Sequence, residues 1–214
     1  MMFLSKSKTR AVHHYHDERE KDNKGDDGEA STSLTVWTKS LVYSCSGFTV
    51  IGSDGGLAYR VDNYTGRPDQ TILMDGSGNP IFTICRRKKL RLLDYWLVYE
   101  GEVCKHSNND MQKPMFCVRK NMRRLRQTKV DDVVAYVYCG VSENRCMYVV
   151  EGSFTHRSCK ILDESRRVVA EIRKKEGLPK GASFGLEVFH LIIKPDFHCR
   201  FAMAIVLLLD QMYS

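Results

Sequence analysis

Five cations crowd into six positions of this sequence, just after an apolar stretch at 81–85. They are Arg86, Arg87, Lys88, Lys89 and Arg91. Phosphate groups are bound by convergent positive charge of this kind, with arginine making paired hydrogen bonds and lysine acting as a point charge. Near a membrane each cation contributes on the order of 1 kcal/mol of attraction to anionic lipid. The run is therefore a candidate site for lipid headgroups, and a solvated hairpin turn is the simpler interpretation.

A second basic cluster follows in a stretch with few apolar residues. Its members are Arg119, Lys120, Arg123, Arg124, Arg126 and Lys129. Such charge suits anionic lipid, nucleic acid or a localisation receptor equally. Base stacking needs aromatic side chains among the cations, and residues 117–135 contain none. We therefore do not expect nucleic acid to be the partner.

Patterns typical of enzymes and metal sites are scarce. The sequence has no GxSxG, HExxH, GxGxxG or GxxxxGK[ST] pattern. His156 and Cys159 predict a turn followed by a buried cysteine rather than a base and a nucleophile. The histidines at 13, 14 and 16 have no carboxylate or cysteine at ligand spacing, and we assign them to a solvated tail. We expect no enzymatic activity, no metal and no cofactor.

The eight cysteines and the first residues bear on the compartment. No CxxC pair occurs, so we expect buried, reduced thiols rather than disulfides or a zinc site. The stretch MMFLSKSKTR lacks the apolar core of a secretory signal. We expect a cytoplasmic protein that is not secreted and has no transmembrane segment, with a peripheral plasma-membrane or nuclear location left open.

Short strands are the elements that must position the basic clusters. Residues 1–33 are polar and mixed in charge, which predicts a flexible tail. From 34 to 194, β-branched and aromatic runs alternate with turn residues, as in many antiparallel strands. Trp37, Trp96 and Tyr99 are predicted in the core or the barrel wall, and Asp62 to Tyr64 in a turn. We expect strands near 34–43, 48–52, 57–62, 71–75, 81–86, 89–92, 95–100, 115–119, 132–139, 146–151, 159–163, 167–173 and 184–193.

The segment from Phe201 to Leu209 predicts the organisation of the core. Its nine consecutive apolar residues cover every face of a helix, which must therefore be buried all round. They span roughly 14 Å against about 30 Å of bilayer hydrocarbon, so burial inside protein is the better interpretation. Strands that surround a helix need a barrel wider than the eight-stranded kind, and roughly a dozen would suffice.

Several segments carry a resemblance to a known family. They are LTVWTKSLVY (34–43), GFTV (47–50), RVDNY (60–64), ILMDGSGNPIFTI (72–84), RRKKL (86–90), WLVYEGE (96–102), VEGSFTHRSCKI (150–161), AEIRKK (170–175) and AMAIVLLLDQM (202–212). Over about 34–214 the chain resembles the LURP-one-related proteins of plants, which share the Tubby C-terminal-like fold. The resemblance implies a mainly β domain, a twelve-stranded antiparallel β-barrel enclosing a hydrophobic C-terminal helix at about 197–212.

The resemblance also shapes the functional hypotheses. It implies kinship with phospholipid scramblases and with Tubby proteins, which are membrane-tethered transcription regulators that hold phosphoinositides. We expect a monomeric, non-enzymatic binding module in plant stress or defence signalling that contacts phosphoinositide or another anionic lipid. The alternative is a protein-interaction adaptor that does not bind lipid. A scramblase would need the terminal helix to span a bilayer, and its apolar part is too short.

Overall fold

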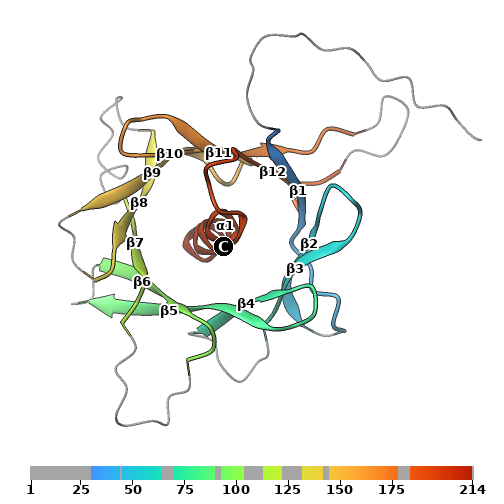
Figure 1. Cartoon of the computed structure of the whole chain (residues 1–214), viewed down its shortest axis with the longest axis horizontal. Coiled ribbons are helices and arrows are strands. Elements are labelled where there is room, and N and C mark those ends of the chain that lie inside the picture. The colour runs from blue at the N-terminus through green and yellow to red at the C-terminus, as the bar shows by residue number, and fades with distance from the viewer. Residues whose placement is uncertain are drawn as a thin grey trace, which may run out of the picture.

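Twelve antiparallel strands follow one another around a closed barrel, and one helix fills it (Figure 1). The structure is a computed structural model that describes residues 30–43, 45–63, 70–89, 93–103, 113–121, 132–141, 145–177 and 184–213. The strands are β1 (Thr32–Trp37), β2 (Ser46–Ile51), β3 (Leu57–Asn63), β4 (Gln70–Asp75), β5 (Pro80–Lys89), β6 (Leu93–Glu100), β7 (Phe116–Lys120), β8 (Val133–Cys139), β9 (Cys146–Ser153), β10 (Ser158–Leu162), β11 (Val168–Lys174) and β12 (Val188–Ile193). The helix is α1 (Cys199–Tyr213).

The barrel closes where its first and last strands meet. β1 pairs with β12 along its whole length, so that Val36 lies opposite Phe189, and every other strand pairs with its neighbours in sequence. Closure leaves none of the twelve strands with an unpaired edge, which removes a common site of aggregation. The expected twelve-stranded barrel around a C-terminal helix is confirmed.

Alternation along the strands and the all-apolar sequence of α1 build one core. Strand residues such as Val36, Ile84 and Val118 point inward and are fully buried. They surround the buried helix residues Ala202, Met203, Ala204, Ile205, Val206, Leu207, Leu208, Leu209 and Met212. The helix therefore stabilises the barrel by removing apolar surface on all its sides from water. Within the described residues, no helix is long and apolar enough to cross a membrane.

Several expected boundaries differ from the structure. The strand expected at 34–43 ends at Trp37, and the strand expected at 184–193 begins at Val188. A separate strand was expected near 89–92; Lys89 is the last residue of β5, β6 begins at Leu93, and residues 90–92 lie outside the described residues. The helix expected at about 197–212 runs from Cys199 to Tyr213, after a turn in which the Phe197 amide donates to the Lys194 carbonyl at 3.0 Å. The tail at 1–29 lies outside the described residues, and β1 begins two residues before the expected start of the domain.

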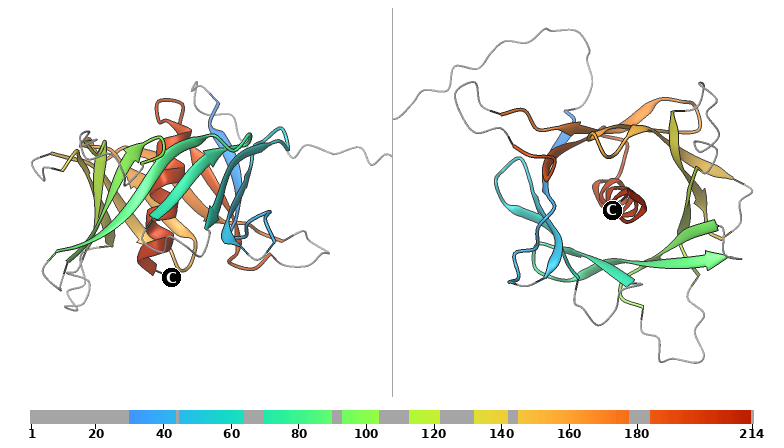
Figure 2. Two further views of the ribbon diagram at one scale, coloured as in Figure 1. Left: turned by 90° about the horizontal axis from the view of Figure 1, so that it is seen from below. Right: turned by 180° about the vertical axis from the view of Figure 1, so that it is seen from behind.

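The barrel has two distinct ends, which we name after the terminal residues of α1 (Figure 2). At the Cys199 end, Phe201 packs 4.3 Å from Phe116 between ring centroids, next to the start of β7. At the Tyr213 end, the Tyr213 hydroxyl donates to the Val134 carbonyl at the start of β8. Because the strands alternate in direction, the connections β1–β2, β3–β4, β5–β6, β7–β8, β9–β10 and β11–β12 all lie at the Tyr213 end.

Candidate functional site

The described members of the two basic clusters lie at the Tyr213 end of the barrel. β5 carries Arg86 and Arg87 toward this end, and β7 carries Arg119 and Lys120 toward it. β6 lies between these two strands and pairs with both. Lys88 and Lys89 are the last two residues of β5. Arg91, Arg123, Arg124, Arg126 and Lys129 lie outside the described residues.

Two arginines flank a tyrosine on the outer surface of the barrel wall. Arg87 of β5 is opposite Tyr95 of β6, which in turn is opposite Arg119 of β7. The Arg119 guanidinium carbon lies 6.0 Å from the centroid of the Tyr95 ring. Burial raises the pKa of the neighbouring Tyr99 hydroxyl, and a hydrogen bond from Arg87 opposes that rise. Arg87 and Arg119 thus place two cations beside the Tyr95 ring. Such a surface is suited to binding phosphate oxygens.

The expectation that the run from Arg86 to Lys89 forms a hairpin turn between two strands is wrong. These residues extend β5 and pair with β6, from Arg86 opposite Trp96 to Lys89 opposite Leu93. Strand alternation places Arg86 and Arg87 on opposite faces of the sheet. The Arg86 guanidinium carbon lies 5.6 Å from the centroid of the Trp96 ring, which is in the core. Arg87 therefore shares its surface with Arg119, 32 positions away, and not with its neighbour Arg86.

Lys120 has a structural contact inside the barrel. Its Nζ donates a 2.6 Å hydrogen bond to the main-chain oxygen of Met212 and lies 4.2 Å from the centroid of the Tyr213 ring. The last carbonyls of a helix have no partner within the helix, and positive charge is favourable there. Lys120 thus completes the end of α1.

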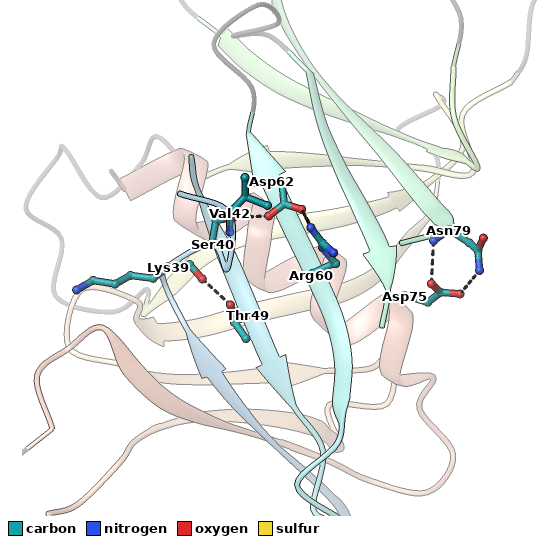
Figure 3. A network of polar contacts seen from close by, with 8 residues as sticks. All are labelled: Lys39, Ser40, Val42, Thr49, Arg60, Asp62, Asp75 and Asn79. Atoms are coloured by element: carbon teal, nitrogen blue, oxygen red, sulfur yellow. Dashed lines mark hydrogen bonds and ion pairs between the residues drawn. The ribbon is translucent and has the colours of Figure 1, made fainter. Parts of the chain in front are cut away.

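A buried carboxylate organises the next sector of the same end (Figure 3). Asp62, whose side chain is only 1% exposed, pairs with Arg60 and accepts a hydrogen bond from the Ser40 hydroxyl. Ser40 Oγ in turn accepts from the Val42 amide at 3.0 Å, and Thr49 Oγ1 donates to the Lys39 carbonyl at 2.7 Å. Asp62 was expected in a turn; it is instead a strand residue that ties the chain after β1 to β3.

Large apolar side chains are exposed on this sector. Trp37 is 38% exposed, Leu41 56% and Tyr43 96%, and Leu186 just before β12 is also exposed. The expectation that both tryptophans lie in the core or the barrel wall is confirmed: Trp96 is in the core and 1% exposed. Trp37 is in the wall, on its outer side. The Tyr213 end therefore combines cations with exposed aromatic and aliphatic groups.

The Cys199 end holds a cavity of different character. It has a volume of about 650 Å³ and is lined by Phe82 and Phe201, by the acids Asp75 and Glu100 and by Arg200, among others. This volume is within the range of small-molecule sites. The Asp75 carboxylate already accepts hydrogen bonds from the Ser77 and Asn79 amides at 2.9 and 2.8 Å. Charges of both signs line the cavity, so its lining does not select for anions.

The remaining sequence candidates have structural roles. The exposed His156 ring forms a 2.8 Å hydrogen bond with the Ser153 hydroxyl, and Cys159 is buried in β10. The prediction of a turn followed by a buried cysteine is therefore confirmed. The seven cysteines in the described part of the chain are free, but only Cys117 and Cys159 are buried and Cys139 is exposed. The histidines at 13, 14 and 16 and Cys104 lie outside the described residues.

Fold and core together define a class, the closed antiparallel barrels built around an apolar helix. An X-ray structure of a protein from Arabidopsis thaliana has this fold, with a TM-score of 0.59 and 21% identity over 87% of this chain and 94% of that one. The sequence profile of the LURP-one-related family matches residues 32–210, and the chain belongs to this family. Protein LURP-one-related 17 of Arabidopsis thaliana is 45% identical over 88% of this chain and 86% of its own length. Protein LURP-one-related 8 of the same plant is 43% identical over 87% and 90%.

Proposed function

We propose that this protein is a non-enzymatic binding module that docks on anionic membrane lipid, such as phosphoinositide, through the outer surface of β5, β6 and β7. The observation that carries the proposal is the row of Arg87, Tyr95 and Arg119. Two guanidinium groups on either side of Tyr95, carried by a rigid sheet, can each make paired hydrogen bonds to phosphate oxygens. By resemblance to the family, the setting would be plant stress or defence signalling.

The distribution of charge supports this orientation. The chain has a net charge of +7, and its first 33 residues carry nearly equal numbers of acids and bases, so the excess is in residues 34–214. The strands that end at the Tyr213 end add Arg173 and Lys174 of β11 to the cations of β5 and β7. A surface with an excess of cations attracts an extended anion and aligns the molecule before contact.

Co-sedimentation with vesicles tests the proposal. We would compare neutral phosphatidylcholine vesicles with vesicles that also contain phosphatidylserine or phosphoinositide. Replacement of both Arg87 and Arg119 by Ala removes two charges and should weaken binding to the anionic vesicles by about tenfold or more. High salt should have a similar effect, because it screens attraction to headgroups.

A matched control separates local from general charge. Arg145→Ala with Arg166→Ala removes the same charge near the Cys199 end, where both side chains are exposed. The control variant should bind anionic vesicles like the wild type. If the wild type pellets with no vesicle at any salt concentration, lipid docking is refuted and the protein-adaptor hypothesis takes its place. Equal loss in both double variants would refute the assigned surface.

A further inference from the structure

The chain between β1 and β2 presents apolar side chains to solvent at the Tyr213 end. We call residues 38–43 the prong. Leu41 and Tyr43 in the prong are among the most exposed large apolar side chains in the described residues. Seven such side chains are exposed there, and five of them, Trp37, Leu41, Tyr43, Phe184 and Leu186, lie at the Tyr213 end. Single exposed apolar residues are ordinary, but their concentration on one rim indicates a contact surface.

The prong is held in place by the polar network of Figure 3. The Asp62 carboxylate accepts a hydrogen bond from the Ser40 hydroxyl, whose oxygen accepts one from the Val42 amide. The Thr49 hydroxyl donates to the Lys39 carbonyl. The Asp62 side chain at the centre of this network is only 1% exposed. A segment fixed before binding loses little conformational entropy when it binds. The network thus keeps the Leu41 and Tyr43 side chains pointing into solvent. Without these hydrogen bonds the segment could fold back and pack them onto the barrel.

We infer that the prong enters the interfacial layer of the anionic membrane on which the protein docks, with Leu41 and Tyr43 at the boundary between headgroups and acyl chains. This inference rests on the proposed function. Aromatic side chains with a polar tip favour that layer, and apolar groups of interfacial segments are buried about 5–10 Å into it. Lys39, whose Nζ lies 5.8 Å from the centroid of the Trp37 ring, can remain at headgroup level while its stem packs on the indole.

The placement of the two surfaces favours a membrane over a protein groove. β1 and β12 lie on the opposite side of the barrel from β6 and β7 (Figure 1). The prong and the arginine row therefore stand on opposite sides of one rim. A broad, flat anionic surface can contact both at once, with headgroups on the arginines and the acyl boundary at the prong. A membrane whose plane faces the Tyr213 end of the barrel is such a broad, flat surface.

Trp37 supplies a reporter for the test. The chain has two tryptophans, and Trp96 is enclosed in the barrel, so a change in emission on binding arises at Trp37. Anionic vesicles whose acyl chains carry bromine should quench this emission in the full-length protein. Trp37→Phe should abolish the quenching. Leu41→Ser with Tyr43→Ser should lower the vesicle partition coefficient about tenfold and remove most of the quenching.

Two further variants keep the result specific. Val141, 59% exposed at the Cys199 end, matches Leu41 in exposure, and Val141→Ser should bind like the wild type. Ser40→Ala keeps Leu41 and Tyr43 but releases the prong, and it should weaken partitioning less than their removal does. Urea unfolding of each variant would show that the barrel is intact.

The outcomes distinguish this inference from the proposed function. Binding to anionic vesicles without quenching of Trp37, and equally strong in the Leu41/Tyr43 variant, would overturn the prong's role and leave lipid docking standing. If neutral vesicles quenched Trp37 as strongly as anionic ones, insertion of the prong would be supported. Docking driven by the charge of the lipid would then be refuted. Failure to bind any vesicle would overturn both.

Discussion

Lys120 and Met212 are joined by a hydrogen bond of 2.6 Å across 92 positions of sequence, from the ammonium on β7 to a main-chain oxygen in the last turn of α1. The bond fastens the last turn of the helix to the wall, at the same end as the hydrogen bond from the Tyr213 hydroxyl to the Val134 carbonyl. α1 has no basic residue of its own in its last turn, so the wall supplies the charge.

Removal of this contact should destabilise the barrel without changing its fold. Lys120→Met keeps most of the stem and removes the charge and the donors. We expect the free energy of unfolding to fall by about 1–2 kcal/mol, from the lost helix-end interaction and the unpaired carbonyl. Urea unfolding measures the change. Lys113→Met, at an exposed position, is the control, and an equal loss there would refute the role of Lys120.

The middle of α1 should be the most sensitive part of the core. Leu207 is buried on all sides, and Leu207→Ala leaves a cavity that the closed wall cannot fill. We expect a loss of about 2–5 kcal/mol in the free energy of unfolding. Leu41→Ala, the same change at an exposed position, should alter stability by no more than about 0.5 kcal/mol. Differential calorimetry of the two variants would contradict us if their melting temperatures shifted alike.

Gly152 should tolerate no side chain. It has φ +109°, and a Cβ there would lie 2.2 Å from the Ser158 carbonyl oxygen and 3.0 Å from Cys159 Cα across the β9–β10 pair. Gly78 also has a positive φ, +92°, but a Cβ there meets nothing within 4 Å. Both alanine variants share the backbone strain, so Gly152→Ala should cost about 1–3 kcal/mol more than Gly78→Ala. Guanidinium unfolding curves of the pair give the difference, and equal midpoints would disprove the close approach.

Asp75 should contribute a pH-dependent part of the stability. Hydrogen bonds from the Asn79 side chain, and from the Asn79, Ser77 and Gly78 amides, hold the pKa of its carboxyl below the ordinary value. A lowered folded-state pKa stabilises the fold above the unfolded pKa of about 3.9, and this contribution disappears as the pH falls through the folded-state pKa.

The variant Asp75→Asn isolates that contribution. Wild type should be more stable than the variant at pH 6, and the gap should shrink steadily as the pH falls from about 5 to 3. Thermal melts at a series of pH values measure it. A gap that stayed constant over this range, or widened toward acid, would show that the carboxylate is not the group responsible.

Sequence reasoning reached the barrel because one segment left few alternatives. Nine apolar residues ending at Leu209 had to be buried on every face, and a wide strand barrel offers such a site in a chain of many short strands. The strands were predicted from short β-branched and aromatic runs separated by turn residues. The boundary at Lys89 was missed because consecutive charged residues resemble a turn, whereas pairing with β6 extends the strand through them.

The candidate site was predicted in residue type but not in arrangement. Local sequence cannot show that Arg87 shares a surface with Arg119, because their proximity depends on the register of β6 with both neighbours. Lys120 was grouped with Arg119 by charge, yet strand alternation sends it toward the helix. The prong was missed because Leu41 and Tyr43 were predicted to end a strand. The hydrogen bond from Ser40 to Asp62 could not be foreseen, because the two residues are brought together only by the fold.

The order of elements along the chain has a consequence for how this molecule reaches its native state. All twelve strands precede α1, and β1 must wait for β12, more than 150 residues later, before the ring closes. Such distant pairings make folding slow, because chain entropy is lost long before the contacts that repay it are made. During synthesis the wall is made before the helix that fills it, so the inward faces of the strands stay open to water or to chaperones until α1 arrives. We expect that last step to turn a loose set of hairpins into a barrel in a single cooperative transition.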